Sequence, residues 1–508
     1  MLKPPVQEKF TQRENNRSGC YVSSRNHALV KKCTALALLL LAFHFGYSQY
    51  AYSIKLTLRP YRHVKVYLGY YYGKIRALAD SALLDANATG TFHGKEKLPS
   101  GIYFIVSPRK EILFEVLLDK DEHFEISADS ASLPDQVLFT NSPENTLFLS
   151  YSLYMAKEGK AIHDQQIALS AAKDRSDSTL IRQHITALSQ EVQLYRDKIQ
   201  KDHSQSLLTV LLMALKEPVI PPALGPKASQ SDSLYAYHYY MAHYWDEISF
   251  TDDRLIRTPI LEPKLDKYFK DVVVPDADSI EREVDHMLLV ARVNKEMFKY
   301  LLVYFVQKYI NPEYMGQDAV FVHLFEKYIN TGQADFFTDK YRKFANDRAY
   351  SLMANLIGQP APNLIMTDTS EQVRQLYDVD APFIVVCFWD PTCSHCKETV
   401  PKLDSIYQAK WKSEGVQIFG VMVDGGKDAW LKFIRDNNLR NWIHVYQTDA
   451  QHTAEIAGDR PGYRQLFDVY QTPILYLLDK EKRIIAKKLT YLQLDEVISL
   501  KIKSVKSR

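Results

Sequence analysis

An apolar run that leads directly into a close pair of cysteines constrains the fold of this chain most. The run Phe383–Trp389 contains no charged residue, which is typical of a central β-strand covered on both faces. The motif Cys393-Ser394-His395-Cys396 follows, at the start of a helical pattern, so Cys393 should lie where unpaired N–H groups stabilise a thiolate. The spacing lets Cys396 attack a mixed disulfide on Cys393. We therefore predict Cys393 as the nucleophile and Cys396 as the resolving thiol.

The pattern around this pair predicts an α/β domain over residues 358–508. Two prolines in Gly358–Asn363 favour an extended entry segment. Beyond it, strand and helix patterns alternate. The predicted strands are Phe383–Trp389, Val416–Val423, Ile443–Tyr446, Ile474–Leu478 and Ile484–Lys488, and the predicted helices are Cys393–Trp411, Lys427–Asn437 and a last helix from Leu492.

The cysteine segment resembles the active-site segment of the thioredoxin superfamily. Trp389 lies four residues before the nucleophile, Pro401 lies five after the resolving cysteine, and Thr472-Pro473 before a strand is similar to the family's cis-proline loop. The entry segment, and the extra segment before the Thr-Pro loop, are similar to the exported TlpA/ResA-like branch. The resemblance implies a thioredoxin-like fold in which Pro473 is cis and contributes to catalysis beside the cysteine pair, while Trp389 and Thr472 contact the substrate.

The chain departs from the family pattern at the group that would take the proton of Cys396. Cys387 stands where ordinary thioredoxins have a buried aspartate, and a thiol is a poor base. Thr399 stands where the TlpA/ResA-like branch often has a glutamate, and Glu398 lies one position earlier. Water and Glu398 are the remaining candidates.

His395 replaces the proline of the ordinary thioredoxin dipeptide, as in more oxidising members of the superfamily. A histidine beside the thiolate stabilises it and raises the reduction potential, which would make His395 part of the catalytic machinery. The alternative is a solvent-facing side chain with little influence. The direction of electron transfer stays open in either case.

The amino-terminal segment predicts export. Arg25, Lys31 and Lys32 precede an apolar run at 34–43, which is too short for a bilayer span and is typical of a secretory signal peptide. We predict a signal peptide over residues 1–48 and a mature protein in the periplasm or cell envelope; a retained membrane anchor is the alternative. Removal of the segment leaves three cysteines, too few for a disulfide framework.

Two further regions precede the α/β domain. Short apolar bursts separated by turn residues predict a small antiparallel β-sandwich over residues 50–140. Helical periodicity predicts an all-helical region over residues 141–355, interrupted at Pro218–Pro226. Both regions loosely resemble domains that accompany thioredoxin-like domains in exported proteins of Bacteroidetes. A tyrosine-rich stretch at 235–244 fits helix packing or a recognition surface.

Composition and motif chemistry exclude several other functions. A formal net charge of +2 gives no basis for nucleic-acid binding. No His, Met or Cys follows His452, so a metal site at the cysteine pair would lack its distal ligand. A c-type haem attachment site needs a histidine directly after the second cysteine, where this chain has Lys397. We expect no cofactor.

The sequence predicts a thiol–disulfide oxidoreductase that acts on cysteines of exported proteins and exchanges electrons with a membrane or periplasmic thiol donor or acceptor. The alternative is a binding or scaffold protein of the envelope in which the thioredoxin-like domain is a minor or regulatory module.

Overall fold

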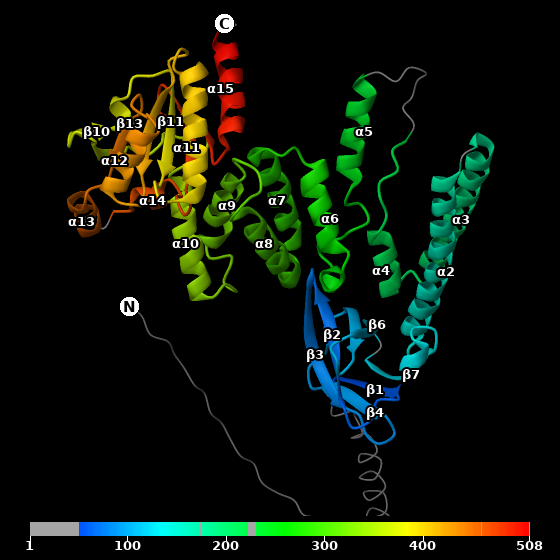
Figure 1. The fold of residues 1–508 in the computed structure, drawn as a ribbon. Helices are drawn as coiled ribbons and strands as arrows, with labels where there is room; N and C mark the ends of the chain where they lie inside the picture. The colour runs from blue at the N-terminus through cyan, green and yellow to red at the C-terminus, as the bar shows by residue number, and fades with distance from the viewer. Residues whose placement is uncertain (1–49, 121, 173, 222–229, 459, 507–508) are drawn as a thin grey trace, which may run out of the picture.

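A computed structural model of the protein describes residues 50–120, 122–172, 174–221, 230–458 and 460–506. Along the chain, a β-sheet domain is followed by a helical region and then by an α/β domain (Figure 1). This order confirms the predicted fold class. The predicted signal peptide lies outside the described residues. Within the described residues, no helix combines the length and apolar character that a bilayer span requires.

The first domain is a sandwich of two four-stranded sheets. One sheet has the order β4-β1-β7-β8 and the other the order β3-β2-β5-β6. Apolar side chains of both sheets, among them Ile54, Leu68 and Phe92, are fully buried in one shared core. The strands are β1 (Tyr52–Arg59), β2 (Lys65–Tyr72), β3 (Ile75–Leu83), β4 (Thr89–Gly94), β5 (Gly101–Val106), β6 (Ile112–Leu118), β7 (His123–Asp129) and β8 (Val137–Thr140).

One pairing corrects the predicted antiparallel sandwich. β1 pairs with β7 in parallel, over Ser53↔His123 to Arg59↔Asp129, while the other pairings in the two sheets are antiparallel. Apolar periodicity shows which face of a strand is buried but carries no information about the direction of its neighbour. The strand pattern could therefore predict the sandwich without predicting this pair.

The middle region is helical. Helices α2 and α3 form a long antiparallel pair that projects from the β-sheet domain (Figure 1). The later helices pack around a large apolar core, which also receives side chains such as Phe104 from the sandwich. The helices are α2 (Pro143–Ala171), α3 (Arg175–Asp202), α4 (Leu207–Ala214), α5 (Gln230–His243), α6 (Leu261–Lys267), α7 (Ala277–Ala291), α8 (Lys295–Tyr309), α9 (Asp318–Leu324) and α10 (Asp339–Met353).

The tyrosine-rich stretch lies on α5 and just beyond it. Tyr244 is buried and donates a hydrogen bond to the carbonyl oxygen of Lys264 at 3.0 Å. Tyr237 donates to the carbonyl oxygen of Val272 at 3.0 Å, whereas Tyr235 is exposed. These contacts agree with the packing interpretation for the inner tyrosines.

The α/β domain is built on a seven-stranded mixed sheet with the order β10-β9-β13-β12-β11-β14-β15. The predicted strands and helices all form, and β11 coincides with the predicted apolar run. The sequence did not predict the edge strands β9 and β10 or the short helices α13 and α14. The elements are β9 (Ile365–Asp368), β10 (Val373–Gln375), β11 (Phe383–Trp389), α11 (Ser394–Ile406), β12 (Gln417–Met422), α12 (Lys427–Asp436), β13 (Ile443–Tyr446), α13 (Asp449–Ala457), α14 (Tyr463–Leu466), β14 (Ile474–Asp479), β15 (Ile484–Lys487) and α15 (Tyr491–Lys506).

Strand β11 lies in the middle of this sheet, between β12 and β14. Its alternate side chains enter two different cores. Val385, Cys387 and Trp389 pack on the face that also buries Cys396 of α11, and the others pack on the opposite face. Burial on both faces explains why the strand is apolar throughout.

Buried charges join the helical region to the α/β domain. Lys487 of β15 pairs with Asp318 of α9 and donates to both oxygens of Asn355 at 2.7 Å, and all three residues are buried. Asp468, in the loop after α14, binds Arg348 of α10 and Lys488. The second network fixes the chain four residues before Thr472, at the edge of the candidate site.

Candidate active site

The predicted cysteine pair lies at the junction of β11 and α11. The strand ends at Trp389, and Cys393 is the N-cap residue of α11, with extended backbone angles (φ −68°, ψ 129°). The Cys393 thiol makes no capping hydrogen bond, so the first N–H groups of α11 remain able to stabilise a thiolate on its sulfur. The helix continues through Pro401 and ends in a π-helical turn, Tyr407–Trp411.

Cys393 is the accessible member of the pair. Its side chain is half-buried, and its Sγ lies 3.5 Å from the carbonyl oxygen of Thr472. The pKa of Cys393 is lowered, chiefly by the backbone N–H of Cys396, with contributions from Thr472 and the backbone N–H of His395, against the opposing effect of desolvation. The direction agrees with the sequence prediction for the nucleophile.

Cys396 lies one turn further along α11 and is fully buried. Burial raises its pKa to about 11, although the backbone N–H of Asp390 donates to its sulfur at 3.4 Å. Cys393 therefore ionises at a much lower pH than Cys396. Cys387, Cys393 and Cys396 are all free thiols, so this arrangement is that of the reduced pair.

The loop between α14 and β14 completes the site. The Thr472–Pro473 peptide bond is cis, as the sequence resemblance implied. β14 begins directly after it and pairs with β11, which brings the loop beside the cysteines. The contact between Thr472 and Cys393 confirms that this loop lies next to the predicted nucleophile.

The side chain of His395 is exposed to solvent. The group of His395 that acts on the Cys393 sulfur is its backbone N–H, which any residue except proline would supply. The influence of the imidazole on the reduction potential stays a prediction. Glu398 is also exposed, two residues from buried Cys396 on the helix, and no structural contact supports it as a proton acceptor.

The position of Trp389 corrects one prediction. Its side chain is fully buried, with its ring 5.2 Å from the ring of Phe433 and 6.2 Å from that of His444. A residue without exposed surface cannot contact a docked substrate. Side chains alternate along β11, and that of Trp389 lies in the core that also contains Cys396. It therefore packs beneath the site in the protein interior.

Sequence reasoning missed several groups of the site because they carry no side-chain signal. The N–H groups of Cys396 and Asp390 act through the main chain, and only the strand-to-helix geometry reveals them. His444 was also missed, because nothing in the sequence relates its strand, β13, to the cysteine pair. Within the described residues, no group of His, Cys, Asp and Glu is arranged to hold a metal ion.

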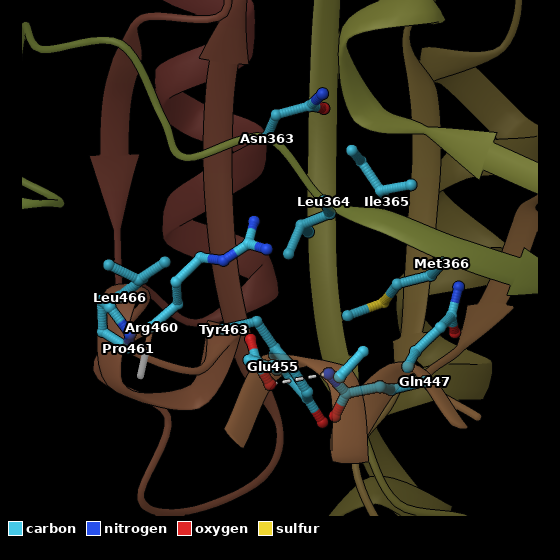
Figure 2. A pocket seen from close by; sticks show the side chains of 12 residues that line it. Asn363, Leu364, Ile365, Met366, Gln447, Glu455, Arg460, Pro461, Tyr463 and Leu466 are labelled. Carbon is cyan, nitrogen blue, oxygen red and sulfur yellow. Dashed lines mark hydrogen bonds between the residues drawn. The ribbon is translucent and has the colours of Figure 1, made fainter. Parts of the chain in front are cut away.

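A separate cavity of about 440 Å³ lies in the same domain, between β9, α13 and α14 (Figure 2). Gln447 and Glu455 form a hydrogen bond of 2.8 Å in its wall. Arg460 and Tyr463 also line it. None of the predicted site residues lines it, so the cysteine pair lies outside this cavity.

Comparison with known proteins places these observations in a family. Residues 179–349 match a domain of unknown function, DUF5106, and residues 357–487 match the AhpC/TSA family. The chain is 24% identical over 131 residues to the thiol-disulfide oxidoreductase ResA of Bacillus cereus, a match that covers 26% of this chain and 68% of the relative.

Two solved structures are also similar. A domain of a possible thiol-disulfide isomerase from Cytophaga hutchinsonii is 36% identical, with a TM-score of 0.26, and the match covers 30% of this chain and 97% of that domain. A thioredoxin-like protein from Bacteroides caccae is 22% identical, with a TM-score of 0.44, and the match covers 56% of this chain and 98% of that protein.

The match to the AhpC/TSA family coincides with the α/β domain that carries the cysteine pair, and the match to DUF5106 lies in the helical region before it. Through this domain, the chain belongs to the TlpA/ResA-like branch of the thioredoxin superfamily, as a thiol–disulfide oxidoreductase with additional N-terminal domains.

Proposed function

We propose that the chain exchanges disulfides with cysteine-containing exported proteins through Cys393 and Cys396. In the reducing direction, the Cys393 thiolate attacks one sulfur of a client disulfide, and the other client sulfur leaves with the bonding electrons and takes up a proton. The Cys396 thiol then loses its proton and attacks Cys393. The mixed disulfide breaks, the client leaves as a second thiol, and the pair is left oxidised.

The observation that carries this proposal is that the pKa values of the two neighbouring thiols are shifted in opposite directions. The half-exposed Cys393 has a lowered pKa, and the buried Cys396 has a pKa raised to about 11. An exposed thiolate reacts first, and the buried thiol can attack only a sulfur already bound to its neighbour. This order of reaction is the one that disulfide exchange requires.

Thr472 supports a client-docking role for the loop before β14. Its carbonyl oxygen lies 3.5 Å from the nucleophilic sulfur, so a client backbone beside Cys393 would meet main-chain groups of this loop. Main-chain hydrogen bonds suit clients of varied sequence, because they do not depend on client side chains. Pro473 would contribute by shaping the loop at this point.

We also propose that the protein works in the periplasm or cell envelope. The support is the signal-like pattern of residues 1–48 and the small number of cysteines that follow it. A membrane or periplasmic thiol protein would then restore the redox state of the pair. The β-sheet domain and the helical region are together longer than the α/β domain, and we propose that they contribute to the choice of partner.

Insulin reduction with dithiothreitol tests the proposed chemistry. The wild-type chain should accelerate insulin precipitation, and Cys393→Ser should abolish the acceleration because it removes the nucleophile. Ser413→Ala, an exposed position remote from the pair, is the matched control and should retain full activity. Equal rates for the wild type and Cys393→Ser would show that the pair does not carry the function, and would favour a binding or scaffold role.

A further inference from the structure

Side chains of the helical region reach the segment that leads to the Thr472 loop. Helix α10 lies at the boundary with the α/β domain and contacts α14 (Figure 1). Three contacts join the end of α10 and the residues after it to residues 465–468: Ser351 Oγ donates to the carbonyl oxygen of Gln465, Asn355 Nδ2 donates to that of Leu466 at 2.9 Å, and Arg348 binds Asp468. The chain directly before the loop is therefore held by a different region of the protein.

Arg348 is the central residue of these contacts. Its Nη1 donates to the carboxylate of Asp468, while Nε donates to the carbonyl oxygen of Ile310 at 3.3 Å and Nη2 donates to Asn311 Oδ1 at 3.1 Å. Ile310 and Asn311 follow α8, so the planar guanidinium group is fixed from the side of the helical region. The position of Asp468 is thereby defined relative to that region.

Asp468 is a buried anchor of the loop. It is 2% exposed, and Lys488 binds its second carboxylate oxygen. Burial alone would raise the pKa of Asp468, but the hydrogen bonds from Arg348 and Lys488 hold it below its ordinary value, so the residue is charged at neutral pH. Its backbone has a φ of 52°, which is uncommon for a residue other than glycine. The chain thus turns at a residue whose side chain is fixed by two cations.

Residues 469–472, which we call the docking segment, connect this anchor to the nucleophile. Tyr470 is 75% exposed, and Gln471 is also exposed. The carbonyl oxygen of Thr472 lies 3.5 Å from Cys393 Sγ. Four residues of extended chain span at most about 14 Å, so the docking segment cannot extend far from the sulfur. Its exposed residues are those that a client captured on Cys393 would meet.

A docking surface binds more tightly when its backbone is already ordered. Ordering flexible residues during association costs free energy, and a backbone that is fixed before binding avoids that cost. The Val469 N–H donates to the carbonyl oxygen of Arg464 at 2.7 Å, and Tyr476 Oη donates to that of Phe467 at 2.6 Å. These bonds hold the chain from within the α/β domain, and Arg348 holds it from outside.

We propose that the helical region positions the docking segment through the Arg348–Asp468 pair and thereby sets how efficiently Cys393 captures a protein client. Arg348 is a positioning residue, because it acts through Asp468 and not on the sulfur atoms. This role rests on the proposed disulfide exchange, since it concerns the capture step. It gives part of the region that matches DUF5106 a defined task in that step.

Capture by Cys393 is measured in the Cys396→Ser background, which stops the reaction at the mixed disulfide. A cysteine peptide with a thionitrobenzoate group on its sulfur serves as the client. The Cys393 thiolate attacks the peptide sulfur, a new disulfide forms, and thionitrobenzoate leaves with the bonding electrons as a coloured thiolate. The symmetrical disulfide of thionitrobenzoate undergoes the same reaction without a backbone that could dock.

Arg348→Met removes the guanidinium group and keeps an apolar side chain. It should slow capture of the peptide roughly tenfold, because the docking segment must then be ordered during binding. The rate with the symmetrical disulfide should stay within about twofold of the parent protein, because the thiolate itself is unchanged. Arg348→Lys keeps a cation for Asp468 but loses the planar fork that also binds Ile310 and Asn311, so its loss with the peptide should be smaller.

Arg254→Met is the matched control. Arg254 binds Asp252 and lies 3.5 Å from Asp119, so it joins the helical region to the β-sheet domain and not to the α/β domain. Its replacement should leave capture of the peptide within about twofold of the parent protein, because distant and independent sites do not couple.

The outcomes separate this role from the proposed exchange. If the parent protein does not capture the peptide, the exchange reaction itself is wrong. If the parent captures it and Arg348→Met does so at the same rate, the docking segment needs no anchor. An equal loss with both disulfides, or an equal loss in Arg254→Met, would assign the effect to the nucleophile or to general stability and would overturn the positioning role. If Arg348→Met fails to fold, Asp468→Asn removes the ion pair from the other side and keeps a hydrogen-bond acceptor.

Hydrogen exchange followed by mass spectrometry tests the anchor independently of activity. In Arg348→Met, the amides of residues 466–473 should exchange faster than in the parent protein, because local opening becomes more frequent when the ion pair is lost. The same amides should keep their protection in Arg254→Met. Unchanged exchange of these residues in Arg348→Met would show that α10 does not hold the docking segment.

Discussion

At the scale of single residues, the site depends on where two identical side chains lie. Cys393 and Cys396 have the same chemistry in isolation, and only burial and nearby N–H groups give them different pKa values. The roles of nucleophile and resolving thiol stay predictions from the spacing, and the burial and pKa shifts of the two cysteines agree with them. The apolar run predicted a strand buried on both faces, and the burial of Trp389 fits that pattern, whereas the expected substrate contact of Trp389 came from the family resemblance alone.

Substitutions of His395 test whether its imidazole ring or its backbone N–H acts on the Cys393 sulfur. His395→Pro removes both the imidazole and the backbone N–H that lowers the pKa of Cys393, so the pair should become more reducing. A tenfold change in the exchange equilibrium corresponds to about 30 mV, and we expect a shift of that order. Equilibration with glutathione buffers measures it.

His395→Ala is the matched control, because it removes the imidazole and keeps the N–H. If the main chain dominates, His395→Ala should retain most of the wild-type potential. A shift as large as that of His395→Pro would assign the effect to the imidazole, and an unchanged potential in both variants would make His395 a solvent-facing residue without influence.

At the scale of elements, segments with a clear apolar or helical pattern were predictable, and segments without one were not. β11 and α11 carry long apolar or helical patterns, and both form where they were expected. Strands β13 and β15 have only four residues but were predicted, whereas β9 (IMTD) and β10 (VRQ) contain no comparable apolar pattern. The parallel pairing of β1 with β7 was missed because pairing direction depends on the path of the whole chain.

The start of α11 predicts the pH dependence of the nucleophile. The first-turn N–H groups favour the Cys393 thiolate, so its pKa is lowered, and its alkylation by iodoacetamide should rise with pH to a midpoint below that of an ordinary cysteine, about 8.5. Cys396→Ser isolates this titration from the second thiol. A midpoint at or above the ordinary value would contradict the geometry of the helix start.

At the scale of the whole molecule, the thioredoxin-like domain is joined to the helical region by buried charges. Lys487, Asp318 and Asn355 form one network, and Arg348, Asp468 and Lys488 form another. Sequence analysis predicted three regions in the right order but no coupling between them, since ion pairs between distant segments leave no local pattern. The networks indicate that the helical region and the catalytic domain are stabilised together.

Lys487→Met tests this coupling. It leaves Asp318, which is 4% exposed, without its cation, and loss of one partner of a buried pair costs about 3–5 kcal/mol of unfolding free energy. The double variant Lys487→Met/Asp318→Leu removes both charges and should recover most of that loss. Urea unfolding followed by circular dichroism measures both. A loss below about 1 kcal/mol for the single variant would show that the network is not essential for stability.

Covalent trapping of clients tests the central claim most directly. In Cys396→Ser, a client captured on Cys393 cannot be released by the resolving thiol, so mixed disulfides should accumulate in cells that express it. Mass spectrometry of the purified adducts should map the bond to Cys393 and identify cysteine-containing exported proteins. Cys393→Ser/Cys396→Ser should capture none. Absence of adducts on Cys396→Ser, or equal adducts on the double variant, would contradict disulfide exchange through Cys393 and Cys396.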